Sequence, residues 1–327
     1  MAIVLTHSDV AAIIDRSAVY DAVERAHADL SIGTATNPAP AALSLAGGGT
    51  VIPMTATAER QHYSAVKMLS DMPFNRAVGL PTQRSTILLT STDTGECVAV
   101  LDGRIITAVR TAAASAVATA HLSRASSTSL GLIGAGNLAV EHTRAIARIR
   151  PIDKVFVWSR SAATVDEFRQ RVEDLDLRVE RADSPRHVLS AADVVCTLTP
   201  SRVPIVEGAW FRPGLHLNAV GAPPRNDHRE IDGAGMASAR LVVDSRPTAL
   251  TKSGEVVIAI REGHLRESDV AVELGDVIVD PRRGRQSDDD VTLFNSVGIG
   301  LQDLVTAHAL VETARRRGIG TRVDLGA

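Results

Sequence analysis

A glycine-rich segment between two apolar runs sets the strongest constraint on how this chain folds. Residues 129–139 read Ser-Leu-Gly-Leu-Ile-Gly-Ala-Gly-Asn-Leu-Ala, with Gly134, Gly136 and Ala139 at G-x-G-x-x-A spacing. The first glycine permits a tight strand-to-helix turn, the second lets a pyrophosphate approach bare backbone, and the small third residue lets the helix pack on the strand. A second apolar run at 154–158 supports a dinucleotide site; a glycine turn in another α/β fold is the alternative. The predicted contacts are Gly134, Gly136, Asn137 and Leu138.

The end of the second apolar run bears on which dinucleotide is bound. An NAD site usually carries an acidic residue here, which accepts hydrogen bonds from the ribose. This chain instead has Ser159 and Arg160. A guanidinium offers a bidentate, charge-assisted contact to a 2′-phosphate. We therefore predict NADP(H), with NAD(H) possible and with Ser159 and Arg160 as contacts, unless Arg160 is simply a solvated loop arginine.

Length and composition indicate a globular protein of two domains. The 327 residues exceed a typical single domain, and 45% of them are hydrophobic. An aromatic content of 3% and a net charge of −3 argue against a nucleic-acid partner. Cys97 and Cys196 lack metal-ligand spacing, so no metal site is expected. Residues 1–14 do not resemble a signal peptide and no apolar run is expected to cross a bilayer, so we expect a cytoplasmic protein without a membrane partner.

The first third of the chain predicts an antiparallel sheet with helices. Ser8 or Asp9 can cap a helix that continues through Ala26, and residues 107–123 predict an Ala-rich helix. Residues 93–95, Asp-Thr-Gly, are a good hairpin turn between the last two predicted strands. The predicted strands are residues 42–45, 50–54, 63–69, 85–91 and 96–102.

From residue 129 onward, strands alternate with helical segments, which predicts a parallel sheet. The fold class is therefore α/β, a Rossmann doubly wound parallel sheet with a second, α+β domain. A long final helix is predicted over residues 294–317, and it can return to the first domain. The further strands are residues 154–158, 178–180, 194–198, 215–219 and 241–244.

Two cations in the first domain are candidates for chemistry. Lys67 lies in the otherwise apolar run 65–69, where a charged group tends to have a perturbed pKa. Alternatively, its ammonium reaches water from the end of the strand. Arg110 and Thr111 place a cation and backbone N–H groups in the first turn of the Ala-rich helix, which suits a substrate carboxylate or the cofactor phosphates. The alternative for Arg110 is a surface charge at a helix end.

The start of this helix resembles a family signature. Residues 101–115 read Leu-Asp-Gly-Arg-Ile-Ile-Thr-Ala-Val-Arg-Thr-Ala-Ala-Ala-Ser, which is similar to the signature of the ornithine cyclodeaminase/mu-crystallin family. The resemblance covers nearly the whole chain. Further family segments are matched, in the same order, by Met54 ahead of Lys67, residues 79–82, the Gly134 loop and residues 292–298.

The resemblance implies a discontinuous substrate-binding and dimerisation domain, residues 1–125 with 301–327, and a Rossmann dinucleotide-binding domain, residues 126–300. It also implies a homodimer and a nicotinamide cofactor bound between the two domains. By position, Lys67 matches the family's active-site lysine and Arg110 its carboxylate-binding arginine. Cofactor contacts of the family match Thr82, Thr197, Val220 (through its backbone) and Ser296.

Two departures from the family bear on the substrate. Cyclodeaminases carry an Asp, which acts as the base for ring closure, where this chain has Ala222. In addition, a family arginine that helps to bind the substrate carboxylate has no counterpart in residues 37–42. Arg76, Arg84 or His62 could take its place.

Together, the residues and the resemblance predict an NAD(P)-dependent oxidoreductase that acts on the C–N bond of an amino acid or cyclic imino acid. Its type would be a ketimine reductase or amino-acid dehydrogenase. One alternative is an NAD-dependent, ornithine cyclodeaminase-type lyase, which Ala222 disfavours. Another is a non-catalytic, NADP-binding, crystallin-like protein, which the presence of both Lys67 and Arg110 disfavours.

Overall fold

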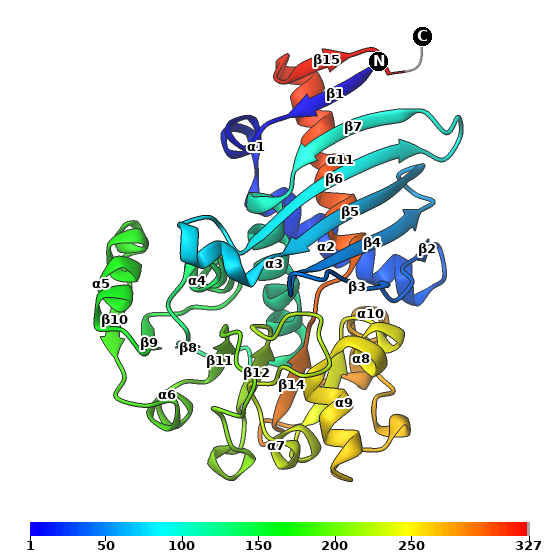
Figure 1. Cartoon of the computed structure of the whole chain (residues 1–327). Helices are drawn as coiled ribbons and strands as arrows, with labels where there is room; N and C mark the ends of the chain where they lie inside the picture. Colours follow the sequence, from blue (N-terminus) through cyan, green and yellow to red (C-terminus); the bar gives the residue numbers. More distant parts are fainter. Residues whose placement is uncertain (326–327) are drawn as a thin grey trace. The chain divides into compact units, whose positions relative to one another are not determined.

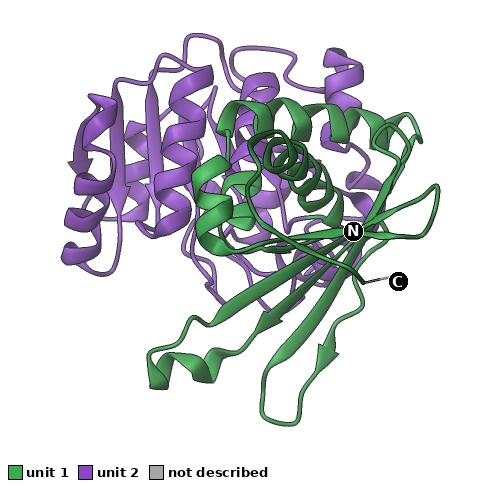
Figure 2. Cartoon of the chain, turned by 90° about the horizontal axis from the view of Figure 1, so that it is seen from above, with its two compact units in different colours: residues 1–111, 299–327 green, residues 112–298 purple. Residues whose placement is uncertain are grey.

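The computed structural model describes residues 1–325, and the chain divides into two compact units (Figure 2). Unit 1 comprises residues 1–111 and the chain from residue 299 onward, and unit 2 comprises residues 112–298. Unit 1 is therefore built from both ends of the chain. The elements of each unit follow the labels in Figure 1.

Unit 1 contains a mixed sheet of order β15-β1-β7-β6-β5-β4-β2, with β3 paired to β4. The predicted strands pair antiparallel, as expected, and the one parallel pair among the described strands of this sheet joins β7 to β1, a strand that was not predicted. Strands β1 and β15, from the two ends of the chain, were not predicted. A strand of three or four residues is too short to show a clear alternation of apolar and polar side chains. The strands are β1 (Ala2–Leu5), β2 (Ala35–Thr36), β3 (Leu43–Ser44), β4 (Thr50–Ala58), β5 (Tyr63–Asp71), β6 (Gln83–Ser91), β7 (Cys97–Asp102) and β15 (Thr321–Val323).

The helices of unit 1 differ from the prediction at both ends of the chain. A single helix over residues 9–26 is wrong, because Thr6 caps α1 (His7–Ile13) and Asp15 caps a separate α2 (Arg16–Ser31). The final helix, α11 (Gly300–Arg317), begins later than predicted because residues 292–295 form a strand. It packs on β4, β5, β6 and α2, and a short 3-10 segment, η1 (Pro73–Val78), precedes β6.

Unit 2 contains a parallel sheet of order β10-β9-β8-β11-β12-β14-β13, which confirms the predicted doubly wound architecture. Strand order reverses between β8 and β11, and ligands of such sheets bind at the carboxyl ends of the strands at this switch point. The strands are β8 (Ser129–Ile133), β9 (Lys154–Trp158), β10 (Arg178–Arg181), β11 (Val194–Thr197), β12 (His216–Ala219), β13 (Arg240–Val243) and β14 (Thr292–Asn295).

Helices follow most of the strands of unit 2, and apolar side chains such as Val195, Leu217 and Leu293 fill its core. Helix α4 begins directly at the glycine-rich segment, as its spacing predicts. The helices are α4 (Asn137–Ile149), α5 (Ala162–Arg171), α6 (Pro185–Ala191), α7 (Gly233–Ser238), α8 (Arg246–Lys252), α9 (Gly254–Arg261) and α10 (Leu274–Val279).

The Ala-rich helix α3 (Arg104–Leu122) contains the boundary between the two units, whereas the predicted domain boundary lies after residue 125. Its N-terminus lies at Arg104 because the Asp102 carboxylate accepts a hydrogen bond from the Arg104 N–H at 3.1 Å. Among the described residues, only α3 is long and apolar enough to cross a membrane, which corrects the expectation that no run has this length. However, 78% of its apolar window is buried, as in the core helix of a folded domain.

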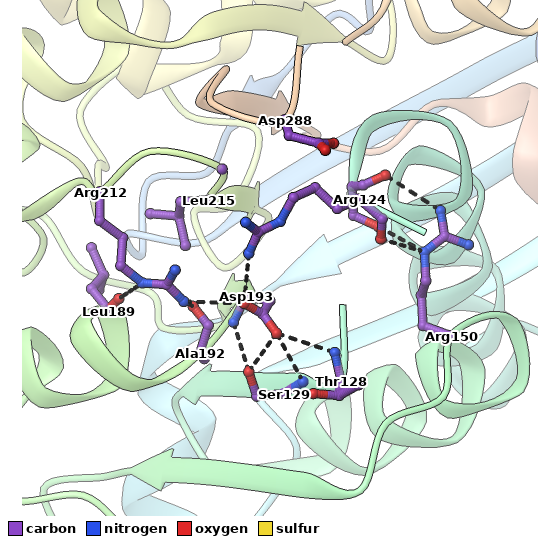
Figure 3. A network of polar contacts seen from close by, with 12 residues as sticks. Arg124, Thr128, Ser129, Arg150, Leu189, Ala192, Asp193, Arg212, Leu215 and Asp288 are labelled. Atoms are coloured by element: carbon purple, nitrogen blue, oxygen red, sulfur yellow. Dashed lines mark hydrogen bonds and ion pairs between the residues drawn. The ribbon is translucent and has the colours of Figure 1, made fainter. Parts of the chain in front are cut away.

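Polar contacts in unit 2 fix the end of α3 and the start of two strands (Figure 3). Arg150 donates to carbonyl oxygens in the last turn of α3, including that of Thr119 at 3.1 Å. Asp193 accepts hydrogen bonds from Arg124 Nη2 at 2.9 Å and from Ser129 Oγ at 2.8 Å. Because Ser129 begins β8 and Asp193 precedes β11, this network lies at the amino ends of the strands. The carboxyl ends remain for ligand binding.

Candidate functional site

The glycine-rich segment of unit 2 has the backbone that a dinucleotide site requires. Gly134 has φ +112°, and a Cβ there would lie 2.9 Å from the carbonyl oxygen of Leu198. Gly136 caps α4 without a side-chain hydrogen bond, and a Cβ there would have no atom within 4 Å. The first-turn N–H groups at Asn137 and Leu138 have no intrahelical acceptor. A pyrophosphate can therefore approach this open helix N-terminus, so these residues fit a dinucleotide.

The strand end that bears on cofactor choice is accessible. Ser159 is half-buried and Arg160 is exposed, directly after β9. Within residues 1–325, Arg160 makes no hydrogen bond or ion pair, so its guanidinium is available to a ligand. The side chain of Asn137 is less available to a ligand, because its oxygen accepts a hydrogen bond from Arg171 Nη2 at 2.7 Å.

The other predicted contacts of unit 2 lie at the carboxyl ends of its strands, and two of them bind carboxylates that the sequence did not single out. Thr197 Oγ1 donates to Glu230 Oε2 at 2.7 Å. Ser296 Oγ donates to Asp244 Oδ2 at 2.9 Å. Val220 belongs to the same edge, since its N–H donates to the carbonyl of Thr197 at 3.2 Å. Asp244 directly follows β13, which is a signal for a strand-end site, whereas Glu230 lies in a loop and gives no such signal.

In unit 1, Lys67 and Arg110 meet at one buried carboxylate. Lys67 Nζ donates to both oxygens of Asp303 at 3.2 Å, and Arg110 Nε donates to Asp303 Oδ1 at 3.1 Å. Lys67 is 1% exposed, Arg110 4% and Asp303 0%. Gln302 accepts from Arg110 Nη1 at 2.8 Å, and its amide nitrogen lies 3.0 Å from His27 Nε2. We call these five residues the cation cluster.

The cation cluster carries two positive charges against one negative charge. Burial lowers the pKa of Lys67 to about 8, with the charge of Arg110 acting in the same direction and Asp303 opposing it. Burial also lowers the pKa of His27 to about 4, so its imidazole is neutral at pH 7. Among the described residues, Arg110 Nη2 has no hydrogen-bond acceptor, and it is not a fully buried atom. The cluster can therefore accept an anionic group beside an ammonium with a near-neutral pKa.

The positions of Arg110, Thr111 and Lys67 differ from the expected ones. Because α3 begins at Arg104, Arg110 and Thr111 lie in its second turn rather than its first, and Arg110 is not a surface charge. Thr111 Oγ1 donates to the carbonyl of Thr107 within the helix at 2.6 Å. Lys67 is likewise buried rather than solvated at a strand end. Thr82 is half-buried just ahead of β6.

The three residues considered as replacements for the missing arginine lie outside the cluster. Arg76, Arg84 and His62 are exposed, and within residues 1–325 none of them makes a hydrogen bond to a cluster residue. The segment that lacks the arginine instead supports α11, because Asn37 Oδ1 accepts from the N–H of Leu301 at 3.1 Å. Arg110 is therefore the guanidinium that the cluster offers to a carboxylate.

Asp303, Gln302 and His27 were missed by the sequence analysis. Asp303 lies between Leu301 and Leu304 in α11, so an acidic residue among apolar helix positions was the available signal. Its partners cannot be read from spacing, because Asp303 lies 236 residues from Lys67 and 193 from Arg110.

Replacing Asp303 tests whether it holds the two cations. Asp303→Asn leaves two buried cations without their counter-charge, and we expect a loss of about 3–5 kcal/mol of unfolding free energy in urea titrations. Where the variant remains folded, the pKa of Lys67 should fall below its value in the wild type, as measured by NMR of ¹³C-methylated lysines. Asp29→Asn, which removes the partner of Arg60 in the same unit, is the matched control. An unchanged Lys67 pKa in Asp303→Asn would contradict the assignment.

Known proteins resemble this chain over most of its length. The family model for the ornithine cyclodeaminase/mu-crystallin family matches residues 1–318. The chain is 33% identical to a Delta(1)-pyrroline-2-carboxylate reductase of Bacillus cereus over 84% of this chain and 85% of that protein. It is similar to the structure of Thermococcus litoralis Delta(1)-pyrroline-2-carboxylate reductase in complex with NADH and L-proline, with a TM-score of 0.94, 33% identity and coverage of 98% and 100%.

A dimeric archaeal alanine dehydrogenase with bound NAD is also similar, with a TM-score of 0.94, 30% identity and coverage of 99% of each chain. These matches extend over both units of the chain. The chain belongs to the ornithine cyclodeaminase/mu-crystallin family.

Proposed function

We propose that this protein is an NAD(P)-dependent oxidoreductase that acts on the C–N bond of an amino acid or cyclic imino acid, of the ketimine reductase or amino-acid dehydrogenase type. The observation that carries the proposal is the cation cluster, in which a guanidinium and an ammonium share one buried carboxylate. The same chain supplies a glycine-rich segment that fits a dinucleotide. Relatives that reduce a pyrroline carboxylate support this substrate class. A cytoplasmic location is part of the proposal.

The cluster suits a substrate with a carboxylate next to a C=N bond. Reduction of that bond adds a hydride to carbon and a proton to nitrogen, and a bound NAD(P)H would supply the hydride. Arg110 would bind the carboxylate through the nitrogen that has no partner in the described structure. Lys67, protonated at pH 7, would donate a hydrogen bond or proton to the imine nitrogen. Asp303 fixes both side chains, so the substrate would be oriented before the reaction.

The cyclodeaminase alternative has less support. Ala222 is 5% exposed and offers no base. The one carboxylate of the cation cluster, Asp303, is already bound to Lys67 and Arg110, so its oxygens are engaged by the two cations. A cyclic imine reductase needs no base for ring closure, because its substrate already contains the ring.

A substrate panel tests the proposal. Cyclic imines with a neighbouring carboxylate, and 2-oxo acids with ammonia or methylamine, would be offered with NADPH and NADH while reduced-cofactor absorbance is followed. We expect turnover with at least one carboxylate-bearing imine and none with its decarboxylated analogue. No turnover of any substrate in either direction would contradict the proposal.

Lys67 should give this reaction a characteristic pH profile. Because the reductive step needs the protonated amine, kcat for reduction should fall as pH rises through about 8, and kcat for oxidation should rise there. Lys67→Met should lower kcat by roughly 10²–10⁴-fold. Lys154→Met, at an exposed ion pair, is the matched control and should behave as wild type. Wild-type kinetics in Lys67→Met would remove the proposed role.

Preference for NADP(H) rests on Arg160, whose exposed guanidinium can pair with a 2′-phosphate. Arg160→Ala should raise the Kd for NADPH roughly 10-fold and leave that for NADH nearly unchanged, because only NADPH carries this phosphate. Calorimetric titration of both cofactors measures the difference. Arg186→Ala, at another exposed arginine, controls for the loss of a surface charge. Equal effects on both cofactors would show that Arg160 does not select between them.

A homodimer is the assembly that we propose, and the outer face of the unit 1 sheet supports it. Met68 on β5 and Leu88 on β6 are 42% and 39% exposed, whereas Lys67 and Ile87 between them point to the buried side. Neighbouring exposed apolar side chains on a sheet face favour an interaction surface. The archaeal alanine dehydrogenase, described as a dimer, supports the same expectation.

Introducing a charge on this face tests the assembly. Leu88→Glu should convert a dimer into a monomer in light scattering at micromolar concentration, since an unpaired carboxylate would be buried at the interface. Val203→Glu changes an exposed apolar residue of unit 2 in the same way and should leave the dimer intact. A monomeric wild type would contradict the proposal.

A further inference from the structure

One buried carboxyl of unit 2 joins two loops at the switch point of the sheet. Glu230 is 0% exposed, and each of its oxygens has two hydrogen-bond partners. Oε1 accepts from the N–H and the Oγ1 of Thr199 at 2.6 and 2.7 Å. Oε2 accepts from Thr197 Oγ1 at 2.7 Å and from the N–H of Gly221 at 2.8 Å. The side chain thus fixes the segments that follow β11 and β12.

These segments also contact the glycine-rich segment. A Cβ on Gly221 would lie 2.0 Å from the backbone nitrogen of Thr199, so the two loops pack backbone to backbone. On the other side, a Cβ on Gly134 would lie 2.9 Å from the carbonyl oxygen of Leu198. The loops after β8, β11 and β12 therefore form one packed layer at the switch point. A shift of residues 198–199 would disturb the turn at Gly134.

We propose that Glu230 is a positioning residue for dinucleotide binding, because it holds this layer in the shape that the cofactor needs. The inference deepens the proposed function and rests on it. Thr197 and Val220 are predicted cofactor contacts, and both depend on the anchored layer. Glu230 acts through them.

Only a carboxyl group satisfies all four contacts. Two of them, the N–H groups of Thr199 and Gly221, lie on different oxygens and can only donate. The two threonine hydroxyls can donate or accept. Burial and the nearby charge of Glu255 raise the pKa of Glu230. Its protonated form would donate to a hydroxyl and still accept from both N–H groups. An amide in place of the carboxyl would instead direct N–H against a backbone N–H.

The neighbouring Glu255 supplies a matched control. It is also buried, and its Oε1 accepts from the N–H of Glu230 at 3.0 Å. Within the described chain, its Oε2 has no partner. Glu255→Gln can keep the accepting oxygen and place its amide at the unpaired position. This variant makes the same chemical change as Glu230→Gln without disturbing the contacts of residues 197–221.

The test is calorimetric titration of the full-length protein with NADPH and NADH, combined with steady-state kinetics. Glu230→Gln should raise Kd for both dinucleotides by about 10- to 100-fold, and Glu255→Gln by less than about twofold. KM for the dinucleotide should rise in Glu230→Gln, while kcat at saturating dinucleotide and KM for the imine stay near wild type. A general loss of structure would not raise KM for the dinucleotide while leaving kcat and KM for the imine unchanged.

Wild-type dinucleotide affinity in a folded Glu230→Gln variant would overturn the inference alone, since the wild type still binds its cofactor. A wild type that binds neither dinucleotide would overturn the proposed function and this inference with it. If Glu230→Gln does not fold, Thr199→Val removes one hydroxyl donor and keeps the backbone N–H. This variant should then raise Kd by about 3- to 10-fold, and an unchanged Kd would overturn the inference.

Discussion

The ion pairs of Asp303 with Lys67 and Arg110 are the interaction on which the rest of unit 1 depends. Lys67 and Arg110 are buried cations, and each would be costly to remove from water without a counter-charge. Asp303 contacts both, and it reaches them because the chain returns from unit 2 and places α11 on β4, β5 and β6. A Cβ on Gly300 would lie 2.9 Å from the carbonyl oxygen of Thr55, so the helix begins in close contact with the sheet. The two buried ion pairs therefore join β5 and α3 to a helix from the other end of the chain.

Unit 2 uses buried carboxyl groups in a related way. Glu230 anchors the loops after β11 and β12, and Asp244 accepts from Ser296 Oγ and the N–H of Gly298. In both places a side chain acceptor fixes backbone at the carboxyl ends of parallel strands. A dinucleotide site needs such order, because its contacts come from several separate loops. The cation cluster of unit 1 differs, since its excess positive charge remains for a ligand.

Features set by local stereochemistry could be predicted from the sequence. The turn at Gly134 needs a positive φ, and alternating strands and helices predict the parallel sheet of unit 2. Helix boundaries that side-chain caps determine could not be predicted from the sequence. Examples are the start of α3 at Arg104 and the break between α1 and α2 at Asp15. Contacts between residues far apart in the sequence could not be predicted either. Lys67 was identified through its apolar context and the family resemblance, but nothing in its surroundings pointed to Asp303.

The most direct test of the roles of Arg110 and Lys67 is a crystal structure of the protein with L-proline and the oxidised cofactor. L-proline carries a carboxylate beside a ring nitrogen, and it is bound in the related Thermococcus litoralis enzyme. We expect its carboxylate to contact the guanidinium of Arg110 and its nitrogen to lie within hydrogen-bond distance of Lys67 Nζ, with Asp303 still bound to both cations. L-proline bound with its carboxylate away from Arg110 and its nitrogen away from Lys67 would contradict the account.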